Sequence, residues 1–279
     1  MATHVNWDPH FGERSPAFHD LRPASAYFAS HQDWPTLADY QSALTQLAPG
    51  LRSAAGAPLV FTDSTSVHDD NEGLSYETNV VRHGHVSTAK CWHDFFQVLV
   101  WATFPRTKTW LNARHANATE QRLARADSQR SPQENALTLF DESGAVILCS
   151  DSQLLELIRA FNWHALFWRR RAELHAVLRC VVVGHALYEK LLHPYIGLTA
   201  HCTLIAVAPA MWPHIKHASM TELDALVQVH LANLGDLQPQ VWNPFPILGL
   251  PGWWPANNEE SFYKNSTYFR AGRRRHRDA

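Results

Sequence analysis

The sequence has few cysteines, and their spacing argues against compact zinc or disulfide frameworks. The four cysteines among 279 residues are Cys91, Cys149, Cys180 and Cys202. Because no two of them form a C-x-x-C pair, a structural zinc site of the finger or ribbon type is not expected. Scattered cysteines in a chain of this length are typical of reduced thiols in a cytosolic protein.

Long hydrophobic runs and a strong net charge are also lacking. The longest apolar run, residues 202–212, is interrupted by Pro209 and is too short to span a bilayer. The first residues lack the basic start and apolar stretch of a signal peptide. A formal net charge of −2 gives the chain no general attraction to nucleic acid or to an anionic membrane. We therefore expect a cytoplasmic protein without a membrane partner. The sequence does not indicate its oligomeric state.

Three common catalytic signatures are missing as well. The sequence contains no G-x-x-x-x-G-K-[ST] phosphate loop, no G-x-G-x-x-G fingerprint and no G-x-S-x-G nucleophile elbow. Enzymes that depend on these nucleotide motifs, and serine hydrolases with this elbow, therefore receive no support. What the chain does have is histidine, with 18 residues, which raises the expectation of metal or acid–base chemistry slightly.

The composition fits one sizeable core, because 46% of the residues are hydrophobic and 18% are charged. We see no internal repeat and no linker, and we predict a single mixed α+β domain over residues 36–269, with helices packed on a small sheet. Residues 1–35, rich in proline, histidine and aromatics, are expected to form an irregular N-terminal arm. Residues 270–279 are expected to form a basic flexible tail.

Hydrophobic periodicity and turn residues give a coarse order of elements. They predict helices over residues 35–47, 118–129 and 221–234, and helices that begin at Asp151, Asn162 and His185. They predict strands over residues 59–61, 76–83, 176–183 and 203–207, and a β-hairpin over residues 135–149. One core is expected to contain Trp92, Phe96, Leu99, Trp163, Phe167, Val181 and Val183.

Residues 84–115 are the densest mixture of apolar bulk and chemically capable side chains. The pattern predicts two helices that meet at Pro105, since proline ends one helix and suits the first position of the next. Ser87 or Thr88 is expected to cap the first helix.

Polar side chains in these two helices are the first candidate site. His93 and Asp94 lie early in the first helix between aromatic residues, and Lys108, Asn112 and His115 share one face of the second. Two interpretations are open for His93 and Asp94: ordinary structural hydrogen bonds, or a functional cluster held rigid by aromatic packing.

A second candidate follows the strand predicted over residues 176–183. His185 and Glu189 lie four residues apart, so they share a helix face and could bind one divalent ion. The alternative is that His185 bonds to nearby backbone and Glu189 is solvated. Asp141 and Glu142, placed at the tip of the predicted hairpin, could bind metal or act in acid–base chemistry, or could simply form the turn.

Five segments occur in an order that matches a known family. They are Trp92–Phe96, Phe104–Lys108, Ala136–Glu142, Gly184–Leu187 with Glu189 and Lys190, and Leu248–Trp253. Together they resemble the bacterial family catalogued as domain of unknown function 3025, over roughly residues 35–275. The chain departs from that pattern at Gln97, where the family is expected to have asparagine. The resemblance implies a bacterial, intracellular protein and supplies no activity.

Two hypotheses follow from the residue chemistry. In the first, the protein is a hydrolase assisted by a divalent metal and acts on a small-molecule substrate that the sequence does not identify. The catalytic residues would be His93, Asp94, Lys108 and Glu189, and the metal ligands His93, His185 and Glu189. In the second, the protein is a non-catalytic binding or interaction module whose polar cluster is structural. The enzyme hypothesis requires the two pairs to face one pocket, and it predicts that His93 and His185 lie close together.

The C-terminal end is a local concentration of positive charge. Its arginines are Arg270, Arg273, Arg274, Arg275 and Arg277. One interpretation is a solubilising end. The other is a weak, sequence-independent contact with nucleic acid or another polyanion, in which neutralised phosphates release counterions.

Overall fold

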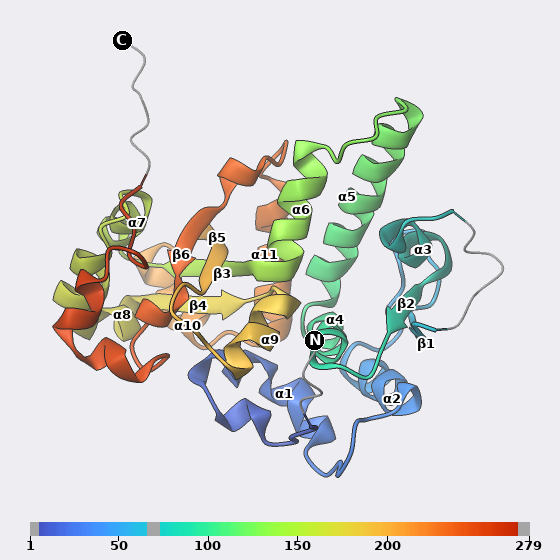
Figure 1. The fold of residues 1–279 in the computed structure, drawn as a ribbon, viewed down its shortest axis with the longest axis horizontal. Coiled ribbons are helices and arrows are strands. Elements are labelled where there is room, and N and C mark those ends of the chain that lie inside the picture. The colour runs from blue at the N-terminus through green and yellow to red at the C-terminus, as the bar shows by residue number, and fades with distance from the viewer. Residues whose placement is uncertain (1–5, 66–72, 273–279) are drawn as a thin grey trace.

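A computed structural model of the chain describes residues 6–65 and 73–272. A four-stranded mixed sheet lies in the middle of the molecule, in the order β4-β3-β5-β6 (Figure 1). Its strands are β3 (Gly144–Cys149), β4 (Leu178–Val182), β5 (Thr199–Ala206) and β6 (Asn243–Pro246). β3 runs parallel to β5 and antiparallel to β4, and β5 and β6 are antiparallel. β3 lies between β4 and β5, and its side chains are buried throughout. This fits its apolar sequence, because a strand that is covered on both faces can be apolar throughout.

Helices surround this sheet, and a smaller sheet lies apart from it (Figure 1). The small sheet pairs β1 (Val60–Asp63) with β2 (His85–Thr88) in parallel. The α-helices are α1 (Arg22–Ser25), α2 (Leu37–Leu47), α3 (Tyr76–His83), α4 (Trp92–Thr103), α5 (Pro105–Ala124), α6 (Pro132–Ser143), α7 (Ser152–Arg159), α8 (Arg171–Val177), α9 (His185–Leu192), α10 (Trp212–Lys216) and α11 (Met220–Ala232). This is the α+β architecture that the sequence predicts.

One continuous hydrophobic core joins these elements. All seven residues predicted to share a core belong to it, from Trp92 on α4 to Val183 after β4. Residues 6–35 form short 3-10 turns and α1, and they add Phe11, Phe18 and Phe28 to the same core. The division into arm, domain and tail stays a prediction, and residues 273–279 of the predicted tail lie outside the described residues.

The two central helices meet at Pro105 as predicted, although their ends differ from the prediction. Ser87 and Thr88 do not cap α4. They belong to β2, and Cys91 precedes the helix in extended conformation without a side-chain cap. No break separates residues 118–124 from α5, which runs unbroken from Pro105 to Ala124.

Residues 76–83 form α3 rather than the predicted strand. The Ser75 hydroxyl accepts a hydrogen bond from the backbone N–H of Thr78, and Gly84 closes the helix with a positive φ of 75°. These two caps satisfy backbone groups at both ends, and they outweigh the weak β preference of Val80 and its neighbours.

The hairpin predicted over residues 135–149 is also wrong. The segment contains the end of α6 and then β3. Ser131 and Glu134 form a capping box, and Pro132 occupies the first helical turn. These start signals lie upstream of the predicted hairpin. Asp141 and Glu142 therefore lie in the last turn of a helix and not at a hairpin tip.

None of the helices within residues 6–65 and 73–272 is long and apolar enough to cross a membrane.

Candidate functional site

A polar pocket opens where α4, α5, α6 and α9 converge beside α3. Its volume is about 380 Å³. Its lining includes His93, Asp94, Gln97 and Trp101 from α4, Lys108, Leu111, Asn112 and His115 from α5, Leu137, Thr138, Asp141 and Glu142 from α6, Tyr76 and Glu77 from α3, and also Ser87, Arg130 and His185. The face shared by Lys108, Asn112 and His115, identified from helical spacing, thus lines the cavity.

The start of α4 supplies His93 and Asp94. Asp94 Oδ2 accepts a hydrogen bond of 2.6 Å from the backbone N–H of Ala89. This contact ties the loop after β2 to the first turn of the helix. The His93 side chain is 37% exposed, so it is supported by the helix and still reachable from solvent.

A close approach of two backbone segments brings His185 to the same pocket. Gly184 packs against the end of α6, and a Cβ there would lie 2.5 Å from the carbonyl oxygen of Glu142 and 2.5 Å from the amide of Gly144. The Gly184 amide also donates to the Gly144 carbonyl at 2.9 Å. Only glycine allows this contact, which places His185 beside the last turn of α6.

His93 and His185 are in direct contact, as the sequence predicts. Their Nε2 atoms lie 3.1 Å apart. On the other side of each ring, His93 Nδ1 lies 3.1 Å from Glu189 Oε2, and His185 Nδ1 lies 2.8 Å from the carbonyl oxygen of Asp141. A carbonyl can only accept, so His185 Nδ1 carries a proton, and the Nε2 of its neutral ring is an acceptor.

The surroundings shift the pKa values of the two rings in opposite directions. The hydrogen bond with Glu189 raises the pKa of His93 and lowers that of the Glu189 carboxyl. Burial lowers the pKa of His185 to about 4, and the nearby charges of Lys108 and His93 act in the same direction. The arrangement therefore favours a protonated His93 whose Nε2–H donates to a neutral His185.

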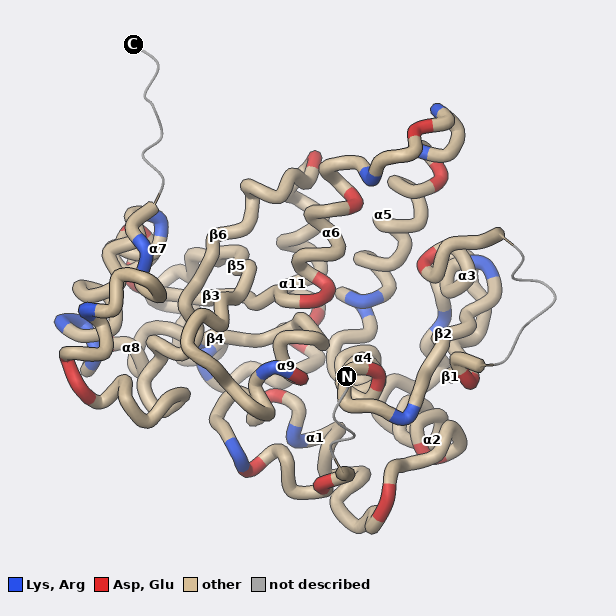
Figure 2. The backbone as a smooth tube through the Cα atoms, viewed as in Figure 1, with Lys and Arg blue, Asp and Glu red and all other residues tan. Residues whose placement is uncertain are grey.

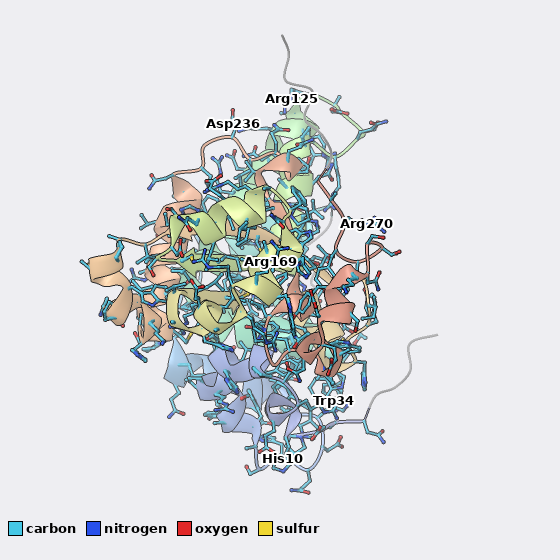
Figure 3. All side chains as sticks on the ribbon, turned by 90° about the vertical axis from the view of Figure 1, so that its left-hand side faces the viewer. His10, Trp34, Arg125, Arg169, Asp236 and Arg270 are labelled. Carbon is cyan, nitrogen blue, oxygen red and sulfur yellow. The ribbon has the colours of Figure 1, made fainter. Side chains whose placement is uncertain are left out.

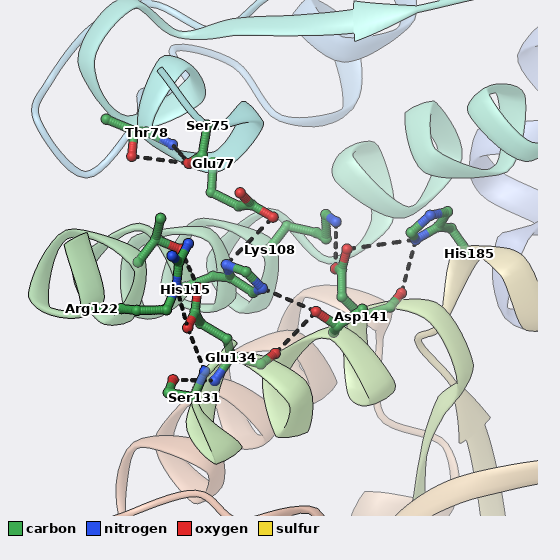
Figure 4. A network of polar contacts seen from close by, with 12 residues as sticks. Ser75, Glu77, Thr78, Lys108, His115, Arg122, Ser131, Glu134, Asp141 and His185 are labelled. Atoms are coloured by element: carbon green, nitrogen blue, oxygen red, sulfur yellow. Dashed lines mark hydrogen bonds and ion pairs between the residues drawn. The ribbon is translucent and has the colours of Figure 1, made fainter. Parts of the chain in front are cut away.

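Lys108 and Asp141 form a buried ion pair next to the histidines. Lys108 Nζ lies 2.5 Å from Asp141 Oδ1, and Asp141 Oδ2 lies 3.7 Å from His185 Nδ1 (Figure 4). Figure 2 shows a basic segment of α5 beside an acidic segment at the end of α6. Burial opposes ionisation of Asp141, but Lys108 and then His185 outweigh it and lower the pKa of this carboxyl. Lys108 Nζ also lies 5.3 Å from the ring centroid of Trp101, a cation–π distance.

The polar network continues along α5 and α6, first within the pocket lining and then beyond it (Figure 4). His115 Nδ1 lies 3.4 Å from Glu77 Oε1, and His115 Nε2 lies 3.0 Å from the Thr138 hydroxyl. Further along the helices, the buried Glu134 carboxylate accepts from Arg122 Nε at 3.0 Å. These contacts hold α3, α5 and α6 in a fixed relation around the pocket.

Two aromatic residues leave a hydrogen-bond donor in the pocket wall. Apart from an interaction with each other, the Tyr76 hydroxyl and the Trp101 indole N–H have no hydrogen-bond partner in the described part of the chain. Two donors cannot both be satisfied by one mutual contact, so at least one of these buried donors lacks a partner among the described residues.

The predicted site residues are brought together, but not as the predicted metal ligands. His93, Asp94, Lys108 and His185 line the pocket, whereas Glu189 stands behind His93 and outside the lining. Glu189 and His185 contact opposite sides of the His93 ring, so these three side chains do not converge on one point. Among residues 6–65 and 73–272, no group of three or more His, Cys, Asp or Glu could hold a metal ion.

Sequence reasoning did not select several residues of the site. The pattern predicts Asp141 only as part of a turn or of a carboxylate pair, and it does not point to Tyr76, Glu77 or Trp101. A usable signal existed for Asp141, since the capping box of Ser131 and Glu134 marks a helix that carries it toward α5. No sequence signal places α3 against α5.

Comparison with known families gives one match. A family model described as "Protein of unknown function (DUF3025)" matches residues 59–273. No curated protein and no solved structure matches the chain.

Proposed function

We propose, for this chain that belongs to the DUF3025 family of proteins of unknown function, that the polar pocket is the active site of a hydrolase for a small polar substrate. The family supplies no activity, so the proposal rests on the residues of the pocket alone. His93 is the general acid and base of this proposal, Glu189 its positioning residue, and His185 its proton partner. The volume of about 380 Å³ suits a small molecule rather than a polymer.

The contact between the two histidines carries the proposal. A proton on His93 Nε2 lies between the rings, 3.1 Å from His185 Nε2, and both rings line the pocket. His93 can give this proton to a leaving group, and its free Nε2 can then take a proton from an attacking water. Glu189 stabilises the imidazolium, as a carboxylate does for a catalytic histidine.

The other polar residues have supporting roles in this proposal. Lys108 is an electrostatic aid of short range, since Asp141 neutralises much of its charge at 2.5 Å. Asp94 has one oxygen on the Ala89 amide, which leaves the other oxygen available to orient substrate or water. The spare donor of Tyr76 and Trp101 can bind a substrate carbonyl or an oxyanion.

Metal assistance is the part of the predicted function that the geometry fits least. Only the Nε2 atoms of His93 and His185 face each other, and two nitrogen donors fall short of the three protein ligands of a usual catalytic zinc site. The proposed acid–base steps use side chains alone.

The test is a screen of small esters, amides and phosphoesters with the purified full chain, followed by comparison of variants. His93→Gln should lower kcat/KM about 10²- to 10⁴-fold, the usual contribution of a general acid–base group. His164→Gln is the matched control, because His164 is also a half-buried histidine paired with a carboxylate, at 2.9 Å from Glu260. Its activity should equal that of the wild type.

Two results would contradict the proposal. Full activity of the His93→Gln variant would remove His93 from catalysis. A chain that binds small molecules in the pocket but hydrolyses none of the tested classes would favour the alternative, a non-catalytic binding module with a structural polar cluster.

A further inference from the structure

A second and larger cavity lies against β4, the strand at one edge of the four-stranded sheet. Its volume is about 1010 Å³, and it shares no lining residue with the polar pocket. It lies between the 3-10 turn Pro16–Leu21, the π-helix Ala165–Arg169, α8 and the turn at residues 250–253. Figure 3 looks onto this side of the molecule and labels Arg169.

The π-helix determines which side chains reach this cavity. The amide of Arg170 donates to the carbonyl of Ala165 at 3.0 Å, a hydrogen bond across five residues. This wider turn contains the tightly packed Leu166 and Phe167 and leaves Trp168 and Arg169 in the cavity lining. Single π-turns cost stability and occur often at functional sites.

The three consecutive arginines after Trp168 differ in how their charges are compensated. Arg170 pairs with Asp151 at 2.7 Å and with Glu173 at 2.5 Å. Within the described residues, Arg171 donates only to neutral oxygens, among them the Tyr263 hydroxyl at 2.9 Å.

Arg169 is exposed, and within the described residues it forms no ion pair. The cavity lining contains one carboxylate, Asp20, which pairs with Arg179 at 2.9 Å. Two guanidinium charges, those of Arg169 and Arg171, therefore remain without a carboxylate partner in this wall. His19 and His175, both exposed, line the same cavity.

The walls combine this charge with aromatic surface. Trp168 and Trp253 are half-buried and enter the cavity from two separate segments, and Leu174 and Leu178 give it an apolar floor. Cys180 also lines it, and burial raises the pKa of its thiol, so this side chain stays neutral. A flat ring can stack on an exposed indole face, while an attached anion reaches a guanidinium.

We propose that this cavity is a binding site for an aromatic anion, a flat ring system that carries a phosphate or carboxylate. The indoles of Trp168 and Trp253 hold the ring, and Arg169 holds the anionic group, with the charge of Arg171 behind it. The site needs no phosphate loop, because its contacts come from side chains. It is independent of the hydrolase proposal, since the two cavities share no residue.

The test uses adenosine 5′-monophosphate as the probe and the full chain in isothermal titration calorimetry. The monophosphate should bind at least tenfold more tightly than either adenosine or inorganic phosphate alone, since only it engages both parts of the site. Arg169→Gln should weaken the monophosphate at least fivefold and leave adenosine unchanged. Trp253→Leu should weaken both.

Matched controls separate local effects from general ones. Trp254→Leu changes the neighbouring half-buried indole, which is not part of the lining, and Arg159→Gln removes an exposed arginine from α7. Both should bind like the wild type, and so should His93→Gln. The exposed Arg169 can be replaced without disturbing the core. The Arg169→Gln variant therefore still tests the proposal if Trp253→Leu folds poorly.

Three results would overturn the proposal. They are no binding of the monophosphate at millimolar concentration, equal binding by wild type and Arg169→Gln, and equal affinity for the monophosphate and inorganic phosphate. Tighter binding of a single-stranded RNA oligonucleotide than of the monophosphate would also overturn it, because the ligand of the site would then be a polymer and not a small molecule.

Discussion

At the scale of single residues, the pocket rests on two histidines with opposite proton affinities. The Glu189 hydrogen bond raises the pKa of His93, and burial lowers that of His185 to about 4. Groups whose environments push their pKa values apart are the usual pattern of acid–base pairs. This contrast can be measured without knowing any substrate.

We expect the two histidines to titrate in separate pH ranges. In NMR spectra of histidine-labelled protein, His93 should titrate above the ordinary value of 6.5 and His185 near 4. Glu189→Gln should return His93 toward 6.5, since the carboxylate is the largest cause of its shift. An unchanged His93 in this variant, or a His185 that titrates near 6.5, would contradict the hydrogen-bond scheme.

The lowered pKa of His185 makes the stability of the folded chain depend on pH. The unfolded chain takes up a proton at His185 near pH 6.5, whereas the folded chain does so near 4. Protons therefore favour the unfolded state in this window, and the contribution of His185 to stability falls as the pH drops from 6.5 to 4. His185→Gln should flatten this part of the curve in urea unfolding at several pH values. An equally steep loss of stability in the variant would assign the effect to other groups.

At the scale of elements, the Lys108–Asp141 pair joins α5 to α6. Removing one partner of a buried pair leaves an uncompensated charge, which typically costs about 3–5 kcal/mol. Asp141 is 26% exposed, so Asp141→Asn should cost about 3 kcal/mol in chemical unfolding, near the low end of that range. The exposed pair of Arg82 and Glu120 supplies the control, and Glu120→Gln should cost about 0–1 kcal/mol. Equal losses for the two variants would mean that the buried pair has no special role in joining the helices.

Elements with strong local signals were predicted well. Elements whose secondary structure depends on the capping residues at their ends were not. α4 and α5 have dense apolar periodicity and a proline between them, so their corner follows from the sequence. α3 and α6 contain β-branched or alternating residues whose preferences are weak. Their caps at Ser75, Gly84 and Ser131 decide the outcome.

The candidate site was predicted in part for a related reason. Helical spacing places side chains on one face, and this identified Lys108 and His185, whereas the aromatic neighbours of His93 identified that residue. Spacing does not say which faces meet. The approach of α3 depends on long-range packing, and the separation of Glu189 from the pocket depends on the angle between α4 and α9. Neither follows from local pattern.

At the scale of the whole molecule, α4 links the N-terminal segment to the core. The Trp92 ring lies 5.3 Å from Trp7, 5.4 Å from Phe11 and 5.7 Å from Phe96. Trp92→Ala should therefore lower the free energy of unfolding by about 3–5 kcal/mol, as for other buried aromatics. Trp110→Ala, a partly buried indole on α5, should cost less. Unchanged thermal stability of Trp92→Ala would contradict the role given to α4.

The basic C-terminal end calls for a comparison of two chains, and the structure indicates where to cut. The carbonyl of Arg270 accepts a hydrogen bond of 2.9 Å from Trp163 Nε1, and Gly272 packs against the Phe161 ring. A chain that ends at Phe269 would lose these contacts, so the better truncation ends at Gly272 and removes Arg273–Ala279. We propose that the full chain binds DNA and RNA weakly, equally for different sequences, and that the truncated chain does not.

The affinity should fall steeply from low to moderate salt, because neutralised phosphates release counterions. Filter binding or fluorescence anisotropy at two salt concentrations measures both effects. Equal binding by the two chains would place any polyanion contact elsewhere, and no binding by either would leave these arginines a solubilising end.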